Sequence, residues 1–226
     1  MRQPTPFRTL RILSLGTILF VIGSTFYTWQ IVPSEADVLY RYDATGTLLS
    51  THSKTVMMII MPIVAVSLIS LQTIYSFVEP RKANLERSLK SADATWAALL
   101  IIFVAAQIGM LSLATRSSLD IIPFVGVSFA IALMLMGNFF GKMRSNWFFG
   151  FSTSWTMESD LAWDKTHRLG GRLFFVWGCV LAVVSLMLTS PPLTLVYSIA
   201  GGILASLVLL HIYAYFMWRQ DVAIGR

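Results

Sequence analysis

The sequence has little charge and almost no cysteine. Only 12% of its 226 residues are charged, roughly half the share that a soluble domain carries. The single cysteine, Cys179, excludes an intrachain disulfide and any metal site built from several cysteines. An HExxH motif, a glycine-rich phosphate loop and a recognisable nucleophile–base pair are also missing from the sequence. The common catalytic signatures therefore give no support to an enzyme.

Long apolar runs dominate what is present. Hydrophobic residues make up 56% of the chain, and the mean hydropathy is +0.70. A helix needs about 20 apolar residues to cross the hydrocarbon core of a bilayer. Six stretches meet that length approximately: Ile12–Ile31, Val56–Phe77, Thr95–Ala114, Ile121–Phe140, Leu173–Leu188 and Val196–Trp218. The sequence predicts an all-α membrane protein with six transmembrane helices.

Lysine and arginine are concentrated in alternate connecting segments. Fourteen of the seventeen lie in the N-terminal tail, the second loop, the fourth loop and the C-terminal tail. The positive-inside rule then places both termini and the fourth loop in the cytoplasm, and the Val32–Thr55 loop outside. The net charge of +6 is explained by this topology, so we expect no direct binding of nucleic acid.

The outer loop contains a turn signal. β-prone residues flank Asp43-Ala44-Thr45-Gly46 on both sides, a pattern typical of a hairpin with glycine at a positive-φ position. Two interpretations are open: a lid that faces a ligand, or a plain connector.

Two polar residues lie at membrane depth. Gln107 is in the middle of the third predicted span and His211 is in the sixth. Such side chains face the bundle interior and find partners there. For His211 we favour an interhelical hydrogen bond over a proton-sensitive or ligand-contacting group. A further alternative is a small-solute transporter that uses both residues. No predicted span has a clear charged residue at its centre and no strong inverted repeat is present, which disfavours transport.

The segment Gly137–Arg172 interrupts the apolar pattern. It holds five of the seventeen Lys and Arg residues and three of the seven Trp. Thr156 is a predicted N-cap, and Gly170 is a predicted stop. Acidic residues near the first and basic residues near the second match the helix dipole. The sequence therefore predicts a short interfacial helix, Met157–Leu169, on the cytoplasmic side.

Asp160, Asp164 and His167 would share one face of that helix. Carboxylate and imidazole groups are metal ligands, so the three form a weak candidate metal site, and with it a membrane enzyme or lipid-handling protein. The competing interpretation is a solvated interfacial helix with an Asp164–Arg168 ion pair. We expect no cofactor.

The same segment resembles the signature of the SdpI family. The matching residues are Asn138, Gly141-Lys142, Asn146, Gly150, Thr153-x-Trp155-Thr156, Trp163, Lys165-Thr166-His167-Arg168 and Gly170-Gly171. The family consists of bacterial membrane proteins typified by the immunity protein against the SdpC killing peptide of Bacillus. The resemblance implies six spans in the bacterial plasma membrane with both termini inside. It also suggests a division into an N-terminal membrane half, 1–94, with outer loop 32–55, and an SdpI-like domain, 95–226, with the signature loop 137–172.

The resemblance implies a binding and signalling protein without catalysis. Its partners would be a peptide toxin on the outer side, membrane lipids, and a cytoplasmic repressor held at the membrane. Residues implied to bind the ligand or partner are Asn138, Lys142, Asn146, Trp155, Thr156, Trp163, Lys165, His167 and Arg168. Three positions depart from the usual family pattern, with Phe151 in place of Ile, Ser152 in place of Arg and Ser154 in place of Pro.

Overall fold

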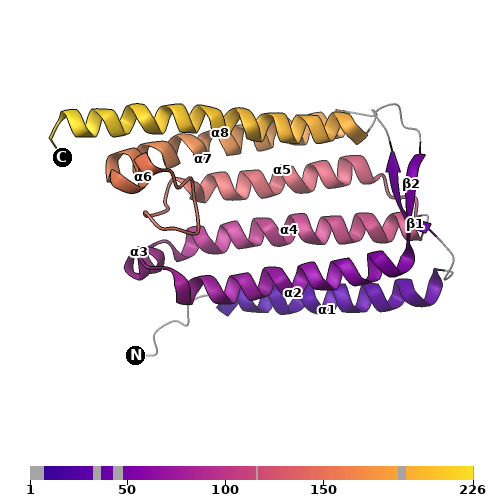
Figure 1. The fold of residues 1–226 in the computed structure, drawn as a ribbon. Helices are drawn as coiled ribbons and strands as arrows, with labels where there is room; N and C mark the ends of the chain where they lie inside the picture. The colour runs from indigo at the N-terminus through magenta and orange to yellow at the C-terminus, as the bar shows by residue number, and fades with distance from the viewer. Residues whose placement is uncertain (1–7, 33–36, 43–47, 116, 188–191, 226) are drawn as a thin grey trace.

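The chain folds into a bundle of long helices with a small hairpin at one end (Figure 1). The computed structural model describes residues 8–32, 37–42, 48–115, 117–187 and 192–225. Six helices have 20 or more residues: α1 (Arg8–Ile31), α2 (Lys54–Val78), α4 (Leu89–Ala114), α5 (Ile121–Phe140), α7 (Asp160–Met187) and α8 (Pro192–Ala223).

Five of these helices, α1, α4, α5, α7 and α8, are long and apolar enough to cross a membrane. The apolar part of α2 is the shorter segment Ile59–Tyr75. The prediction of a helical multi-pass membrane protein is thus confirmed, and the predicted fourth span coincides with α5. Six spans, and which end faces the cytoplasm, remain predictions.

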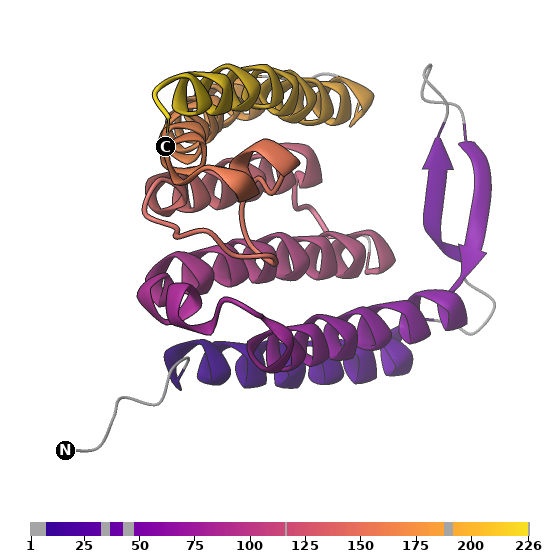
Figure 2. The same ribbon diagram turned by 60° about the vertical axis from the view of Figure 1, so that its left-hand side comes forward.

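The loop between α1 and α2 forms the predicted hairpin. Strands β1 (Asp37–Tyr42) and β2 (Leu48–Ser53) pair antiparallel, with Asp37 opposite Ser53 and Tyr42 opposite Leu48. Its predicted turn, 43–46, lies outside the described residues. The two strands lie beside the helix ends rather than within the bundle (Figure 2).

The connections that are rich in basic residues share one end of the bundle. Helix α3 (Lys82–Arg87), helix α6 (Ser154–Glu158) and the C-terminal end of α8 lie together there, and the hairpin lies at the other end (Figure 1). We call the first of these the basic end. This arrangement agrees with the alternation of charge along the sequence.

The predicted stop at Gly170 is wrong, because α7 continues through it to Met187. The neighbouring glycine lets α5 and α7 approach closely. A Cβ added at Gly171 would lie 2.7 Å from the carbonyl oxygen of Gly137, and one at Gly137 would lie 2.6 Å from the backbone nitrogen of Phe175. No separate interfacial helix Met157–Leu169 exists, since most of it is the first part of α7.

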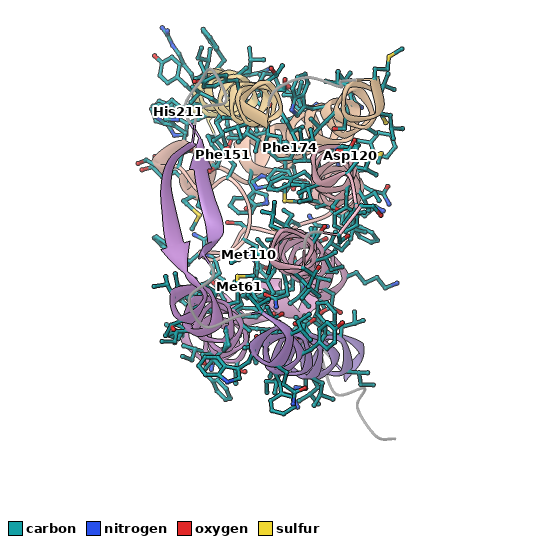
Figure 3. The ribbon with its side chains drawn as sticks, turned by 90° about the vertical axis from the view of Figure 1, so that its right-hand side faces the viewer. Met61, Met110, Asp120, Phe151, Phe174 and His211 are labelled. Carbon is teal, nitrogen blue, oxygen red and sulfur yellow. The ribbon has the colours of Figure 1, made fainter. Side chains whose placement is uncertain are left out.

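Several buried apolar clusters hold the bundle together. One joins α5, α7 and α8 around Phe140, Phe174 and Leu210. On the other side of the bundle, Met61 of α2 and Met110 of α4 lie close together (Figure 3) and pack with Phe103 and Val21.

Candidate functional site

The middle part of the signature loop, residues 141–159, connects α5 to α7 at the basic end. Asn146 organises its first half. This side chain is fully buried, its Oδ1 accepts hydrogen bonds from the N–H groups of Phe148 (3.0 Å) and Phe149 (2.7 Å), and its amide nitrogen donates to the carbonyl of Arg144 (2.9 Å). An amide is suited to this position because it both donates and accepts. Asn146 therefore has a structural role.

His167 is completely buried on α7 and holds the second half of the loop. The N–H of Phe151 donates to its Nε2 (2.9 Å), so the ring proton sits on Nδ1, which donates to the carbonyl of Trp163 (2.8 Å). The imidazole is stacked between the rings of Trp163, 4.0 Å away, and Phe140, 4.8 Å away. Both ring nitrogens are occupied by backbone groups, and the ring is neutral.

Gly150 makes room for that imidazole. Its φ is +103°, a conformation that residues with a side chain resist. A Cβ at this position would lie 2.4 Å from Nε2 of His167. Both the backbone and the neighbouring ring therefore require glycine here.

Trp163 ties the loop to the N-terminal helices. Its indole N–H donates to the carbonyl of Met143 (2.7 Å). Met143, Phe149 and Trp163 belong to one buried cluster, whose members on α1 to α4 are Leu10, Tyr75, Leu85, Ala92, Trp96 and Leu100. The signature loop is thus the place where the two parts of the bundle share a core.

Helix α6 begins at a capping box. Thr153 is the N-cap, and its hydroxyl accepts from the N–H of Thr156, whose own hydroxyl accepts from the N–H of Thr153. The prediction of Thr156 as N-cap is therefore wrong by three residues. Thr156 fills the position at which a capping box places a return hydrogen bond, and it also donates to the carbonyl of Phe151 (2.8 Å).

The connection between α2 and α4 is hydrogen-bonded to the same loop. The sequence analysis did not predict this contact. Glu79 is buried, and its two carboxylate oxygens accept from the N–H groups of Arg81 (2.9 Å) and Trp147 (3.1 Å). The guanidinium of Arg81 donates to the hydroxyl of Ser145 and to the carbonyl of Met157, and the amide of Asn84 donates to the carbonyl of Ser145. The available signal was Glu79 itself, an acid among basic residues directly after a predicted span.

The remaining polar candidates for partner binding are on the surface. Asn138, Lys142, Lys165 and Arg168 are all exposed. Asp164 pairs with Arg144 at 3.8 Å, not with Arg168 as its spacing suggested. The basic end thus presents several cations around a loop whose interior is fully packed.

The three residues of the candidate metal site do not converge. His167 points into the core, Asp160 is exposed, and Asp164 lies against Arg144. Among the described residues, no group of three His, Cys, Asp or Glu side chains is placed to hold a metal ion.

Gln107 and His211 are also apart, on α4 and α8 with α5 between them (Figure 1). Gln107 is buried and donates to the hydroxyl of Ser24 on α1 (2.8 Å), so this side chain finds its partner on a neighbouring helix. His211 is exposed, and its contacts are with aromatic rings. The ring of His211 lies edge-on to the ring of Trp155, with 4.6 Å between the centroids, and 6.2 Å from the ring of Phe151. Phe151 and His211 are both labelled in Figure 3.

These features define a helical multi-pass membrane protein whose basic end is built around a packed signature loop. Residues 142–217 match the SdpI/YfhL protein family, which confirms the resemblance over nearly all of the signature segment 137–172, the rest of α7 and most of α8. Searches of curated proteins and of solved structures gave no significant match.

Proposed function

We propose that this protein is a membrane immunity protein that protects its own cell from a secreted peptide toxin. The observation that carries the proposal is the family match over 142–217, together with the use of its signature residues. Four of these signature residues make only packing contacts and hydrogen bonds with the backbone: Asn146, Gly150, Trp163 and His167. Such a site favours a binding scaffold over a catalyst, because none of these side chains is available to react.

The orientation follows from the distribution of charge. The basic end faces the cytoplasm, and the hairpin of β1 and β2 faces the toxin outside. The hairpin lies beside the helix ends that are opposite the basic end (Figure 2). We assign toxin recognition to this end.

The basic end would receive a cytoplasmic partner, which the resemblance identifies as a repressor. Trp147 and Phe148 are 57% and 47% exposed, although the backbone N–H groups of both are fixed by Glu79 and Asn146. Lys165 and Arg168 are exposed at the same end. Exposed aromatic side chains and arginine are enriched at protein-binding surfaces.

A killing assay tests immunity. The chain is expressed in a toxin-sensitive bacterium and challenged with an SdpC-like peptide, with membrane levels measured in parallel. We expect protection by the wild type and by Arg168→Ala, whose side chain is outside the core. His167→Ala is expected to lose protection together with membrane level, because it damages the fold. Normal insertion without protection by the wild type would contradict immunity to this toxin.

The repressor role is tested separately with Trp147→Ala and Phe148→Ala. Both variants are expected to keep protection but to release a fluorescently tagged repressor from the membrane after toxin challenge. A repressor that never moves to the membrane with the wild type would contradict the signalling role and leave immunity unaffected.

A further inference from the structure

A groove runs along one face of α4 between α1 and α5. Its deeper part has a volume of about 440 Å³ and is lined by residues of all three helices, among them Leu13, Ala97, Ile108 and Phe124. A second hollow of about 360 Å³ continues it toward the basic end and shares Leu13 and Ala97 with the first. Volumes of this size suit a small ligand.

The deeper part offers no free polar group. The hydroxyls of Thr17 and Ser128, its two polar lining residues, donate to the carbonyls of Leu13 (2.9 Å) and Phe124 (2.8 Å) on their own helices. A polar ligand would lose its hydration there without gaining partners. The occupant of this part must therefore be apolar.

Charges lie only at the end of the groove near the signature loop. Lys90 and Asp93 line the second hollow, and Oδ1 of Asp93 is buried without a hydrogen-bond partner in the described part of the chain. Phe139 lines the same hollow, and the ammonium of Lys142 is 4.8 Å from the centroid of its ring. One cation and one carboxylate thus line the mouth, and a second cation lies over an aromatic ring of its wall.

The dimensions match one leaflet of a bilayer. The deeper part extends along α4 from Ala97 to Ile108, about 16 Å at 1.5 Å per residue, and half of the hydrocarbon core is about 15 Å. Lys90 lies about 10 Å further toward the basic end, at the level of the headgroups.

We propose that this groove binds one phospholipid whose headgroup carries both a phosphate and an ammonium, as in phosphatidylethanolamine. An acyl chain fills the apolar part, the phosphate pairs with Lys90 and Lys142, and the ammonium pairs with Asp93. A lipid with an uncharged glycerol headgroup would leave Asp93 without its partner and is the disfavoured competitor. The site does not depend on the immunity function, and its test does not use toxin.

The test is native mass spectrometry of the purified full chain after removal of lipid. The probes are phosphatidylethanolamine and phosphatidylglycerol with identical acyl chains, added in equal amounts. We expect the wild type to retain one molecule, with phosphatidylethanolamine preferred. Ala97→Phe fills the groove and should reduce retention by roughly tenfold, the factor expected when about two methylene groups lose their burial. Val183→Phe, on an exposed face of α7, is the matched control and should retain lipid like the wild type.

The headgroup assignment is tested with two further variants. Asp93→Asn should reduce the preference for phosphatidylethanolamine by roughly two- to fivefold, and Lys90→Gln should weaken retention of both lipids by a similar factor. If Ala97→Phe aggregates, Ser128→Leu blocks the groove from α5 and gives the same comparison. Equal retention by the wild type and a folded groove-filled variant would overturn the site, and equal retention of the two lipids by the wild type would overturn the headgroup assignment.

Discussion

The backbone N–H of Phe151 donates a 2.9 Å hydrogen bond to Nε2 of His167, sixteen residues further along the chain. This contact closes the signature loop onto α7. Since the acceptor is an unprotonated ring nitrogen, the loop depends on a neutral, buried imidazole.

Two replacements of His167 should show how much its hydrogen bond with the N–H of Phe151 contributes to stability. His167→Ala leaves the N–H of Phe151 unsatisfied and creates a cavity, so the free energy of unfolding should fall by about 2–4 kcal/mol. His167→Gln keeps an acceptor near the position of Nε2 and should recover part of that loss. Thermal unfolding in detergent measures both, and equal stability of the two variants would show that the hydrogen bond to Phe151 contributes nothing.

Gly150→Ala should destabilise the protein by about 1–3 kcal/mol, the usual cost of a residue forced into a disfavoured backbone conformation. The added Cβ would also collide with His167. Gly16→Ala is the control, because nothing lies within 4 Å of a Cβ at Gly16 and alanine favours a helix. The midpoint temperatures of the two variants should move in opposite directions.

Gly171→Ala tests the close packing of α5 and α7. The new methyl group would meet the carbonyl oxygen of Gly137, and overpacking of this kind costs about 1–3 kcal/mol. Gly201→Ala, on α8 with open space around it, is the control and should stabilise the protein by up to about 1 kcal/mol, as alanine does in a helix. A wild-type melting curve for Gly171→Ala would mean that the helices separate at little cost.

Glu79→Ala should loosen the signature loop from the connection between α2 and α4. It removes the acceptor for the N–H groups of Arg81 and Trp147, at an expected cost of about 1–3 kcal/mol. Glu86→Ala, which changes an exposed acid nearby, is the control. Limited proteolysis of inverted vesicles should cut the loop faster in Glu79→Ala only, and unchanged cleavage would contradict the role of Glu79.

The hydrogen bond between Gln107 and Ser24 should contribute little. A double-mutant cycle with Gln107→Leu and Ser24→Ala is expected to give a coupling energy of about 0.6 kcal/mol, the average for such pairs in membranes. Steric trapping or denaturant titration in mixed micelles measures it. A coupling indistinguishable from zero would show that the 2.8 Å contact is replaced equally well by packing.

The fold was predictable to the extent that it depends on apolar length and on turn chemistry. Apolar runs located the long helices, and the residues around Asp43-Ala44-Thr45-Gly46 indicated the hairpin. The predicted helix end at Gly170 was wrong because a glycine can either end a helix or allow a close contact between helices. Only the position of α5 decides between these two roles at Gly170 and Gly171.

The candidate site was predictable as a segment but not as a geometry. Asp164 and His167 are three residues apart, which is 60° around a helix. That is enough to bury one against Phe140 and to leave the other 40% exposed beside Arg144. Glu79 could not be linked to Trp147 from one sequence, because 68 residues separate them.

The connection between α2 and α4 grips the loop mostly through main-chain atoms: the N–H of Trp147, the carbonyl of Ser145 and the carbonyl of Met157. Main-chain atoms are the same in every residue other than proline. Outward side chains such as those of Trp147, Phe148 and Ser154 can therefore be exchanged while the frame that presents them persists. Mutations at this end of the bundle can therefore change the partner that it recognises with almost no loss of folding stability.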